Sequence, residues 1–122
     1  MEFESHLNEL RSIRGYLASN ILNWTGEFLA QHTTDPSIDT TFLSALCNDV
    51  FNHAHSVVEK IDANQECTET LINMPFGTVI LRCSGKSAKA HIHVGCIIVK
   101  DGNVALARMT VEKIAKTVSN LL

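Results

Sequence analysis

One segment near the end of the chain restricts the possible folds more than any other. Residues 90–100 alternate in the manner of a β-strand, with His91, His93, Gly95, Ile97 and Val99 on one face and Ile92, Val94, Cys96 and Ile98 on the other. Both faces become apolar toward the end of the segment, which is typical of a central strand covered on both sides. We therefore expect a sheet with helices packed on both of its faces.

The rest of the chain supplies the other strands and helices of such a fold. Apolar residues spaced by three and four predict helices over 3–12, 40–61 and from 104 onward. Alternating segments bounded by turn residues predict strands over 16–23, 27–32, 67–74 and 78–83. The order helix, two strands, helix, three strands, helix predicts an α+β fold with one antiparallel sheet. A chain of 122 residues is expected to form one domain, 1–122, that buries a core without metal or disulfide cross-links.

The composition argues against several classes of partner. The net charge is −3 and no block of Lys and Arg is present, so we expect no nucleic acid partner. No apolar run reaches the roughly 18–20 residues of a membrane span. The acidic start, Met1 to Ser5, lacks the pattern of a secretory signal, so no direct membrane insertion is expected. Four widely separated cysteines without a Cys-x-x-Cys pair favour a reduced, cytoplasmic protein.

The longest periodic segment, 40–61, carries more apolar surface than one sheet face needs. A stripe at spacings of three and four is widened by further apolar residues; it contains Leu43, Leu46, Val50, Ala54, Val57 and Ile61, flanked by Phe42, Cys47, Phe51 and Val58. Such a wide arc favours a helix with its own core on one side and a second subunit on the other. A helix that is simply well buried in its own domain is the alternative, and the pattern alone does not decide between them.

Short motifs follow one another in the order of a known family. Residues 13–17 read I-x-G-Y-L and open a strand. Residues 23–30 read N-x-x-G-E-F-L-A, similar to the strand–turn D-x-D-G-x-x-L-A of the family. Residues 101–108 read D-x-N-V-A-L-A-R, similar to the N-x-G-x-x-R that leads into its last helix. Over about 110 residues, from Ile13 to Leu122, the chain resembles the roadblock/dynein light chain domain.

The resemblance implies a fold, a quaternary structure and a class of partner. The fold would be a roadblock-like sandwich, related to longin and profilin-like folds, with helices on both faces of a five-stranded sheet. Family members form dimers through their central helices and second strands, and they bind or regulate small Ras-like GTPases or serve as adaptors. We expect a homodimer whose interface on the central helix comprises Leu43, Leu46, Cys47, Val50, Phe51, Ala54 and Val57.

A partner surface is expected on the same helix and on the turn at Trp24. Polar side chains around an aromatic residue are typical of a transient interface, and a large aromatic side chain on a turn either folds back or awaits a partner. The expected partner-binding residues are Trp24, Asn48, Asp49, Asn52, His53 and His55.

These features favour a homodimeric, non-catalytic regulator or scaffold that binds a small Ras-like GTPase. The chain has no phosphate-binding glycine–lysine motif and is not expected to be an enzyme or to use a cofactor. A structural adaptor in a motor or membrane-tethering complex, without GTPase contact, is the alternative.

Two histidines give a third hypothesis, a metal or ligand sensor. His91 and His93 lie on one strand face about 7 Å apart, within reach of one metal ion. Cys83 would be a third ligand if the neighbouring strand is antiparallel. His53 and His55 point about 200° apart on their helix and cannot share a site with each other. Histidines hydrogen-bonded on an exposed sheet face are the ordinary alternative, so no metal site is assigned from the sequence.

Overall fold

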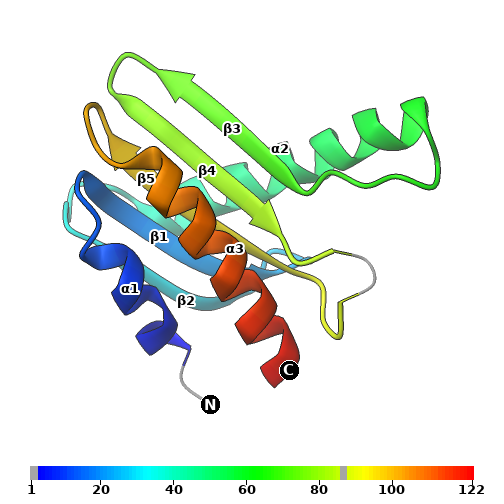
Figure 1. Ribbon diagram of the computed structural model, residues 1–122, viewed down its shortest axis with the longest axis horizontal. Coiled ribbons are helices and arrows are strands. Elements are labelled where there is room, and N and C mark those ends of the chain that lie inside the picture. Colours follow the sequence, from blue (N-terminus) through cyan, green and yellow to red (C-terminus); the bar gives the residue numbers. More distant parts are fainter. Residues whose placement is uncertain (1–2, 86–87) are drawn as a thin grey trace.

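The computed structural model describes residues 3–85 and 88–122 and contains one five-stranded antiparallel sheet (Figure 1). The strand order is β2-β1-β5-β4-β3. In chain order the elements are a 3₁₀ turn η1 (Glu4–Leu7), α1 (Asn8–Arg11), β1 (Tyr16–Asn23), β2 (Phe28–Thr33), α2 (Thr40–Ile61), β3 (Glu69–Met74), β4 (Gly77–Cys83), β5 (Ile92–Val99) and α3 (Val104–Leu121). The predicted α+β class and the predicted order of helices and strands are confirmed.

Helices cover both faces of the sheet, as the apolar alternation of 90–100 predicted. In Figure 1, α1 and α3 lie in front of the sheet and α2 crosses behind it. The apolar strand, β5, is the middle one, and it pairs with β1 on one side and with β4 on the other. Side chains such as Val94 and Ile98 enter the core under α3, whereas Ile97 enters the core under α2. None of the helices in the described part of the chain is long and apolar enough to cross a membrane.

The two faces of the sheet have unequal cores. The core under α1 and α3 is built from large aliphatic side chains that are completely buried, such as Leu7, Leu10 and Val111. The core under α2 is smaller and includes Cys47, Cys67 and Cys83 around the ring of Phe51. All four cysteines are buried and none forms a disulfide. A thin, cysteine-rich core under α2 makes the contacts of that helix depend on a few side chains.

Both long helices begin at a side chain that caps them. The carboxylate of Asp39 accepts a hydrogen bond from the backbone N–H of Phe42 at 3.0 Å, and the Asn103 side chain accepts one from Leu106 N–H at 3.1 Å. Each bond satisfies one of the backbone donors that a helix leaves without a partner in its first turn. These caps fix where α2 and α3 begin.

The start of β5 differs from the prediction in a way that affects the histidines. The hydroxyl of Ser84 accepts a hydrogen bond from Ile92 N–H at 2.9 Å and donates one to the carbonyl of Ala90 at 2.8 Å. This side chain takes the place of a backbone partner, so the ladder begins at Ile92 rather than at Ala90. His91 therefore lies just before the strand, and its ring is less constrained by the sheet than that of His93.

Candidate functional site

The apolar arc of α2 is wider than the sheet covers. One side of the helix packs on the sheet and buries Phe51 and Cys47. The opposite side exposes an apolar stripe made of Phe42, Leu46, Val50, Val57 and Ile61, between 40% and 81% exposed. Leu46, Val50 and Val57 recur at spacings of four and seven, so they form a line along the helix. We call these five residues the outer stripe of α2.

Two of the residues expected in a dimer interface belong instead to the chain's own core. The Phe51 side chain is 1% exposed and its ring stacks on that of His93, with centroids 4.4 Å apart. Cys47 is buried in the same cluster. The expectation that they face a second subunit is therefore corrected, because their side chains point toward the sheet. Leu43 and Ala54 are half-buried at the edge of that core.

Polar residues of α2 that were expected on a partner surface are also buried. The Asn48 side-chain oxygen lies 2.8 Å from His93 Nδ1, and His55 Nδ1 accepts a hydrogen bond from the backbone N–H of Cys67 at 3.2 Å. Because polar side chains and backbone groups on the sheet side satisfy them, Asn48 and His55 face inward, and their assignment to a partner surface is corrected. Asp49, Asn52 and His53 are exposed.

The turn between β1 and β2 holds Trp24 away from the core. The side-chain oxygen of Asn23 accepts hydrogen bonds from Thr25 N–H, Thr25 Oγ1–H and Glu27 N–H at 2.6–3.1 Å. These bonds give the turn a defined shape, yet Trp24 is 58% exposed and does not fold back onto the chain. A Cβ added to Gly26 would lie 3.2 Å from the Asn48 amide, so the turn rests against α2.

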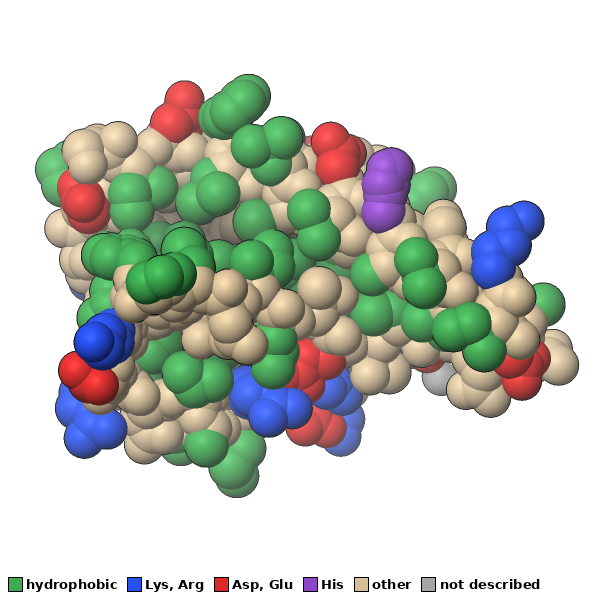
Figure 2. Space-filling view, turned by 90° about the horizontal axis from the view of Figure 1, so that it is seen from above, with side chains coloured by type: hydrophobic (Ala, Val, Ile, Leu, Met, Phe, Trp, Pro, Cys, Tyr) green, Lys and Arg blue, Asp and Glu red, His purple; other side chains and the backbone are tan. Residues whose placement is uncertain are grey.

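A narrow groove runs between α2 and the sheet beside the outer stripe. It is lined by Leu43 and Cys47 from the helix and by Val79, Leu81 and Ile97 from the strands, together with smaller side chains. The space-filling view shows hydrophobic side chains over much of one face, with most charged groups nearer its margins (Figure 2). The outer stripe thus lies next to apolar groups that α2 only partly covers.

A second candidate site lies under the C-terminal half of α2. Ligand atoms of His55, Cys83, His91 and His93 all lie within 4.8 Å of one another. The structure therefore brings together the three residues that the sequence suggested for a metal, and it adds His55, which the sequence missed. The alternative that these histidines occupy an exposed sheet face is wrong for His93, which is 4% exposed, while His91 is half-buried. No signal along the helix could have found His55 here, because its neighbours in the cluster come from β4 and β5.

Comparison with known structures identifies the fold. No family model matches the sequence, and no curated protein matches it. Among solved structures, a Roadblock/LC7 domain from Streptomyces avermitilis matches at a TM-score of 0.79 and 11% identity, covering 99% of this chain and 96% of that one. MglB of Myxococcus xanthus matches at 0.81 and 12% identity, covering 99% and 94%. The chain has the fold of a Roadblock/LC7 domain. An MglB described with a tetrameric arrangement matches at 0.82 and 10% identity, covering 96% and 85%.

The Roadblock/LC7 fold explains why α2 has an outer stripe at all. Helices α1 and α3 share one face of the sheet, whereas α2 lies alone on the other among the described residues (Figure 1). Its far side therefore meets no other helix in that part of the chain. The resemblance noted from the sequence is confirmed at the level of the fold, including the single sheet with helices on both faces.

Proposed function

We propose that this chain is a homodimeric, non-catalytic regulator or scaffold that binds a small Ras-like GTPase. The observation that carries the proposal is the outer stripe of α2, an exposed apolar line on a helix whose other side already packs on the sheet. The Roadblock/LC7 fold supports it, because the family that the sequence resembles forms dimers through this helix and binds such GTPases. The tetrameric arrangement of a structurally similar MglB also favours assembly.

The proposal treats residues 1–122 as one domain acting in the cytoplasm. Four buried cysteines without a disulfide favour a reducing compartment. The alternative of an adaptor without GTPase contact rests on the same outer stripe and differs only in the partner.

Self-association would remove the outer stripe from water. Full burial of one Val or Leu side chain contributes about 1.5–3 kcal/mol. In a two-fold dimer each such residue is buried in both subunits. Phe42, Leu46, Val50 and Val57 are 40–62% exposed, so each would contribute about half of that amount toward offsetting the entropy lost on association.

Replacing Val57 by Asp is expected to give a monomer. Val57 is 61% exposed within the outer stripe, so the change does little to the folded chain but places an unpaired carboxylate within the proposed interface. We expect dimerisation to weaken by at least about 100-fold, measured by sedimentation equilibrium. Ser56→Asp, one residue away on the polar side of α2, is the matched control and should remain dimeric. A wild-type chain that sediments as a monomer at micromolar concentration would contradict the proposal.

The partner surface that we propose combines Trp24 with the exposed polar residues of α2. Gly26 rests against Asn48, and Asn52 follows Asn48 by one helical turn. On this proposal Trp24 and Asn52 form the part of the surface on the flank of α2 that faces the β1–β2 turn. Asp49 borders the outer stripe, and His53, three residues after Val50 and four before Val57, lies within its line. A GTPase and a second copy of the chain would therefore bind next to each other, with His53 at the boundary.

Trp24→Ala and Asn52→Ala are each expected to weaken GTPase binding by more than about 1 kcal/mol, roughly fivefold in affinity. The measurement is a titration with small Ras-like GTPases loaded with GTP or GDP, and we expect binding to depend on the nucleotide. Phe76→Ala is the matched control, because Phe76 is as exposed as Trp24 and lies on the β3–β4 turn. Binding that ignores the nucleotide would favour the adaptor, and wild-type affinity in both variants would refute the surface.

A further inference from the structure

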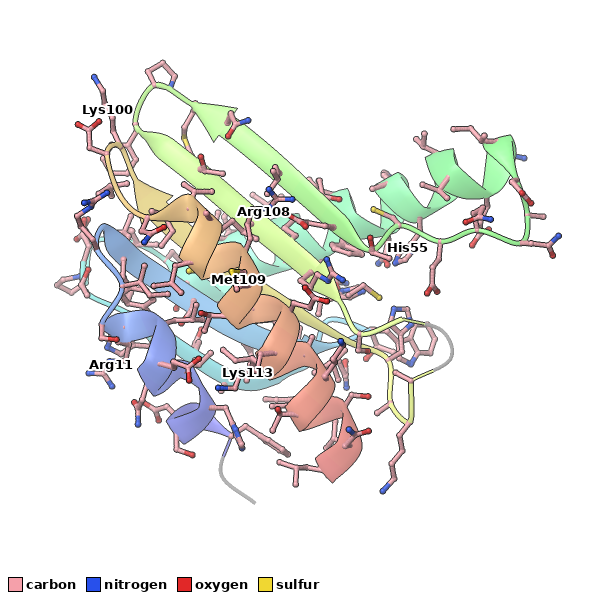
Figure 3. All side chains as sticks on the ribbon, viewed as in Figure 1. Arg11, His55, Lys100, Arg108, Met109 and Lys113 are labelled. Carbon is pink, nitrogen blue, oxygen red and sulfur yellow. The ribbon has the colours of Figure 1, made fainter. Side chains whose placement is uncertain are left out.

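Four metal-binding side chains from three parts of the fold meet under α2. His55 comes from α2 and Cys83 from the end of β4, while His91 lies just before β5 and His93 near its start. Figure 3 labels His55 on α2, where the helix passes the end of the sheet. The ring centroids of His91 and His93 are 5.1 Å apart, and those of His55 and His91 are 5.7 Å apart. Residues this far apart in the sequence meet only because the fold brings α2, β4 and β5 together.

His93 has the properties of a metal ligand that is held in place. Its Nδ1 lies 2.8 Å from the side-chain oxygen of Asn48, so this nitrogen donates a hydrogen bond and Nε2 keeps its lone pair. Among the described residues no group hydrogen-bonds to Nε2, although the side chain is 4% exposed. Metal-binding histidines are commonly oriented by such a hydrogen bond from the other ring nitrogen.

The charge state of His93 also suits a ligand. Burial, followed by the neighbouring His91 and His55 rings, lowers the pKa of His93 to about 3. The imidazole is therefore neutral at physiological pH, which is the form that binds metals. A buried polar atom without a hydrogen-bond partner is destabilising, and a metal ion at Nε2 would remove that cost.

Cys83 and His91 form the other half of the cluster. Cys83 Sγ lies 2.9 Å from His91 Nε2, and it accepts a hydrogen bond from the backbone N–H of Gly85 at 3.3 Å. The Gly85 N–H would continue to stabilise the sulfur after it becomes a thiolate. Both ligand atoms therefore point at the same place as His93.

A Cys–His pair is also the basis of cysteine nucleophiles, and the surroundings of Cys83 argue against that use. Burial raises the pKa of this thiol to about 11, and the side chain is 3% exposed. A nucleophile needs a thiolate that a substrate reaches. A metal ion, by contrast, displaces the thiol proton as it binds and needs no open surface.

His55, the fourth side chain of the cluster, differs from the others because one of its ring nitrogens already accepts a backbone hydrogen bond. Its Nδ1 accepts the backbone N–H of Cys67, so the proton of the neutral ring is on Nε2. His55 would have to give up this arrangement to bind a metal directly. It is therefore the fourth ligand after rearrangement, or a donor to whatever fills the fourth position.

We propose that Cys83, His91 and His93, with His55 at the fourth position, form a zinc site. Thiolate and imidazole are the ligands that Zn²⁺ prefers, in tetrahedral geometry. Bond lengths of 2.0–2.3 Å place tetrahedral ligand atoms about 3.3–3.6 Å apart. The widest pair, at up to 4.8 Å, would contract by about 1.2–1.5 Å, whereas Cys83 Sγ and His91 Nε2, now 2.9 Å apart, would separate by about 0.6 Å. The end of β4 and the residue before β5 allow such shifts more easily than a strand interior. Binding would tie α2 to the sheet at its thinner core.

The test is a titration of the full chain, treated with EDTA, with Zn²⁺ and separately with Co²⁺. We expect one ion per chain and a rise in melting temperature of about 5–10 °C at a hundredfold excess over Kd. Bound Co²⁺ should show the absorption of a tetrahedral centre with a thiolate-to-metal band, which requires no variant. Absence of one-to-one binding, or a Co²⁺ spectrum without tetrahedral and thiolate features, would overturn the proposal.

Variants locate the site within the chain. Cys83→Ser and His93→Ala should each weaken Zn²⁺ binding by about 100-fold or more, and Cys83→Ser should abolish the thiolate band. His55→Ala should reduce Zn²⁺ affinity less than His93→Ala does, because the His55 ring is already hydrogen-bonded to the backbone N–H of Cys67. The matched controls are His53→Ala, exposed on the same helix, and Cys47→Ser, buried in the same core; both should bind as the wild type. Equal binding by all five variants would place the ion elsewhere and refute the site.

Discussion

Replacing Phe51 by Ala should lower the free energy of unfolding by about 3–5 kcal/mol. Phe51 is 1% exposed and is the largest side chain in the core under α2. Its ring stacks on His93 and contacts His55, with centroids 4.4 and 4.9 Å away. Truncation would leave a cavity between α2 and the sheet that small neighbours such as Cys47 do not fill.

Denaturant unfolding with EDTA present measures this effect without any contribution from metal. The Val57→Asp background removes the proposed dimer, whose dissociation would otherwise add to the measured stability. Phe42→Ala is the matched control on the same helix, because Phe42 is 62% exposed, and it should change stability by less than about 0.5 kcal/mol. A loss of under about 1 kcal/mol for Phe51→Ala would mean that α2 does not pack on the sheet as described.

Gly15→Ala is expected to destabilise the chain by about 2–4 kcal/mol. Gly15 has φ +88°, a conformation that costs other residues about 1–2 kcal/mol. An added Cβ would lie 2.6 Å from the backbone Cα of Gly102, which no side-chain rotation relieves. The contact between Gly15 and Gly102 joins the start of β1 to the turn before α3. There the Arg14 carbonyl accepts a hydrogen bond from the backbone N–H of Asn103 at 2.9 Å.

Gly26→Ala separates the two causes. Gly26 also has positive φ, +94°, but its added Cβ would meet only the Asn48 amide at 3.2 Å. The free energy of unfolding of this variant should fall by about 1 kcal/mol, which is the cost of the positive φ without a backbone clash. Thermal or denaturant unfolding of the Gly15→Ala and Gly26→Ala variants measures the two effects. Equal losses of stability would show that the approach of Gly15 to Gly102 is not tight.

Much of the fold follows from periodicity, because burial on a regular element repeats at a fixed spacing. The apolar pattern predicted α2 over 40–61 and β1 over 16–23, and both bounds agree with the structure. The two-sided apolar pattern placed β5 at the centre of the sheet, which the strand order confirms. Strand ends were less accurate, because a side chain such as Ser84 replaces a backbone partner and leaves no periodic signal.

The orientation of α2 was the main point that the sequence could not settle. The apolar pattern predicted Leu46, Val50, Val57 and Phe51 together in a dimer interface and Asn48 and His55 on a partner surface. The structure leaves the first three exposed but turns Phe51, Asn48 and His55 inward, where His93 and the backbone of Cys67 supply partners for Asn48 and His55. Such partners lie far away in the sequence, and a single-helix pattern carries no information about them. His55 was missed as a neighbour of Cys83 for the same reason.

The position of β5 in the sheet also determines when the protein can fold. Strands β1 and β4 flank β5. The β1–β2 half and the β3–β4 half of the sheet are therefore joined only through β5, which follows all four strands in the sequence. Ile21 pairs with Val94, a contact between distant parts of the chain that is slow to form. Until residues 92–99 leave the ribosome, β1 and β4 each keep an unpaired edge, and β5, which contributes side chains to both cores, is absent. Before β5 pairs with them, these unpaired strand edges favour association between chains.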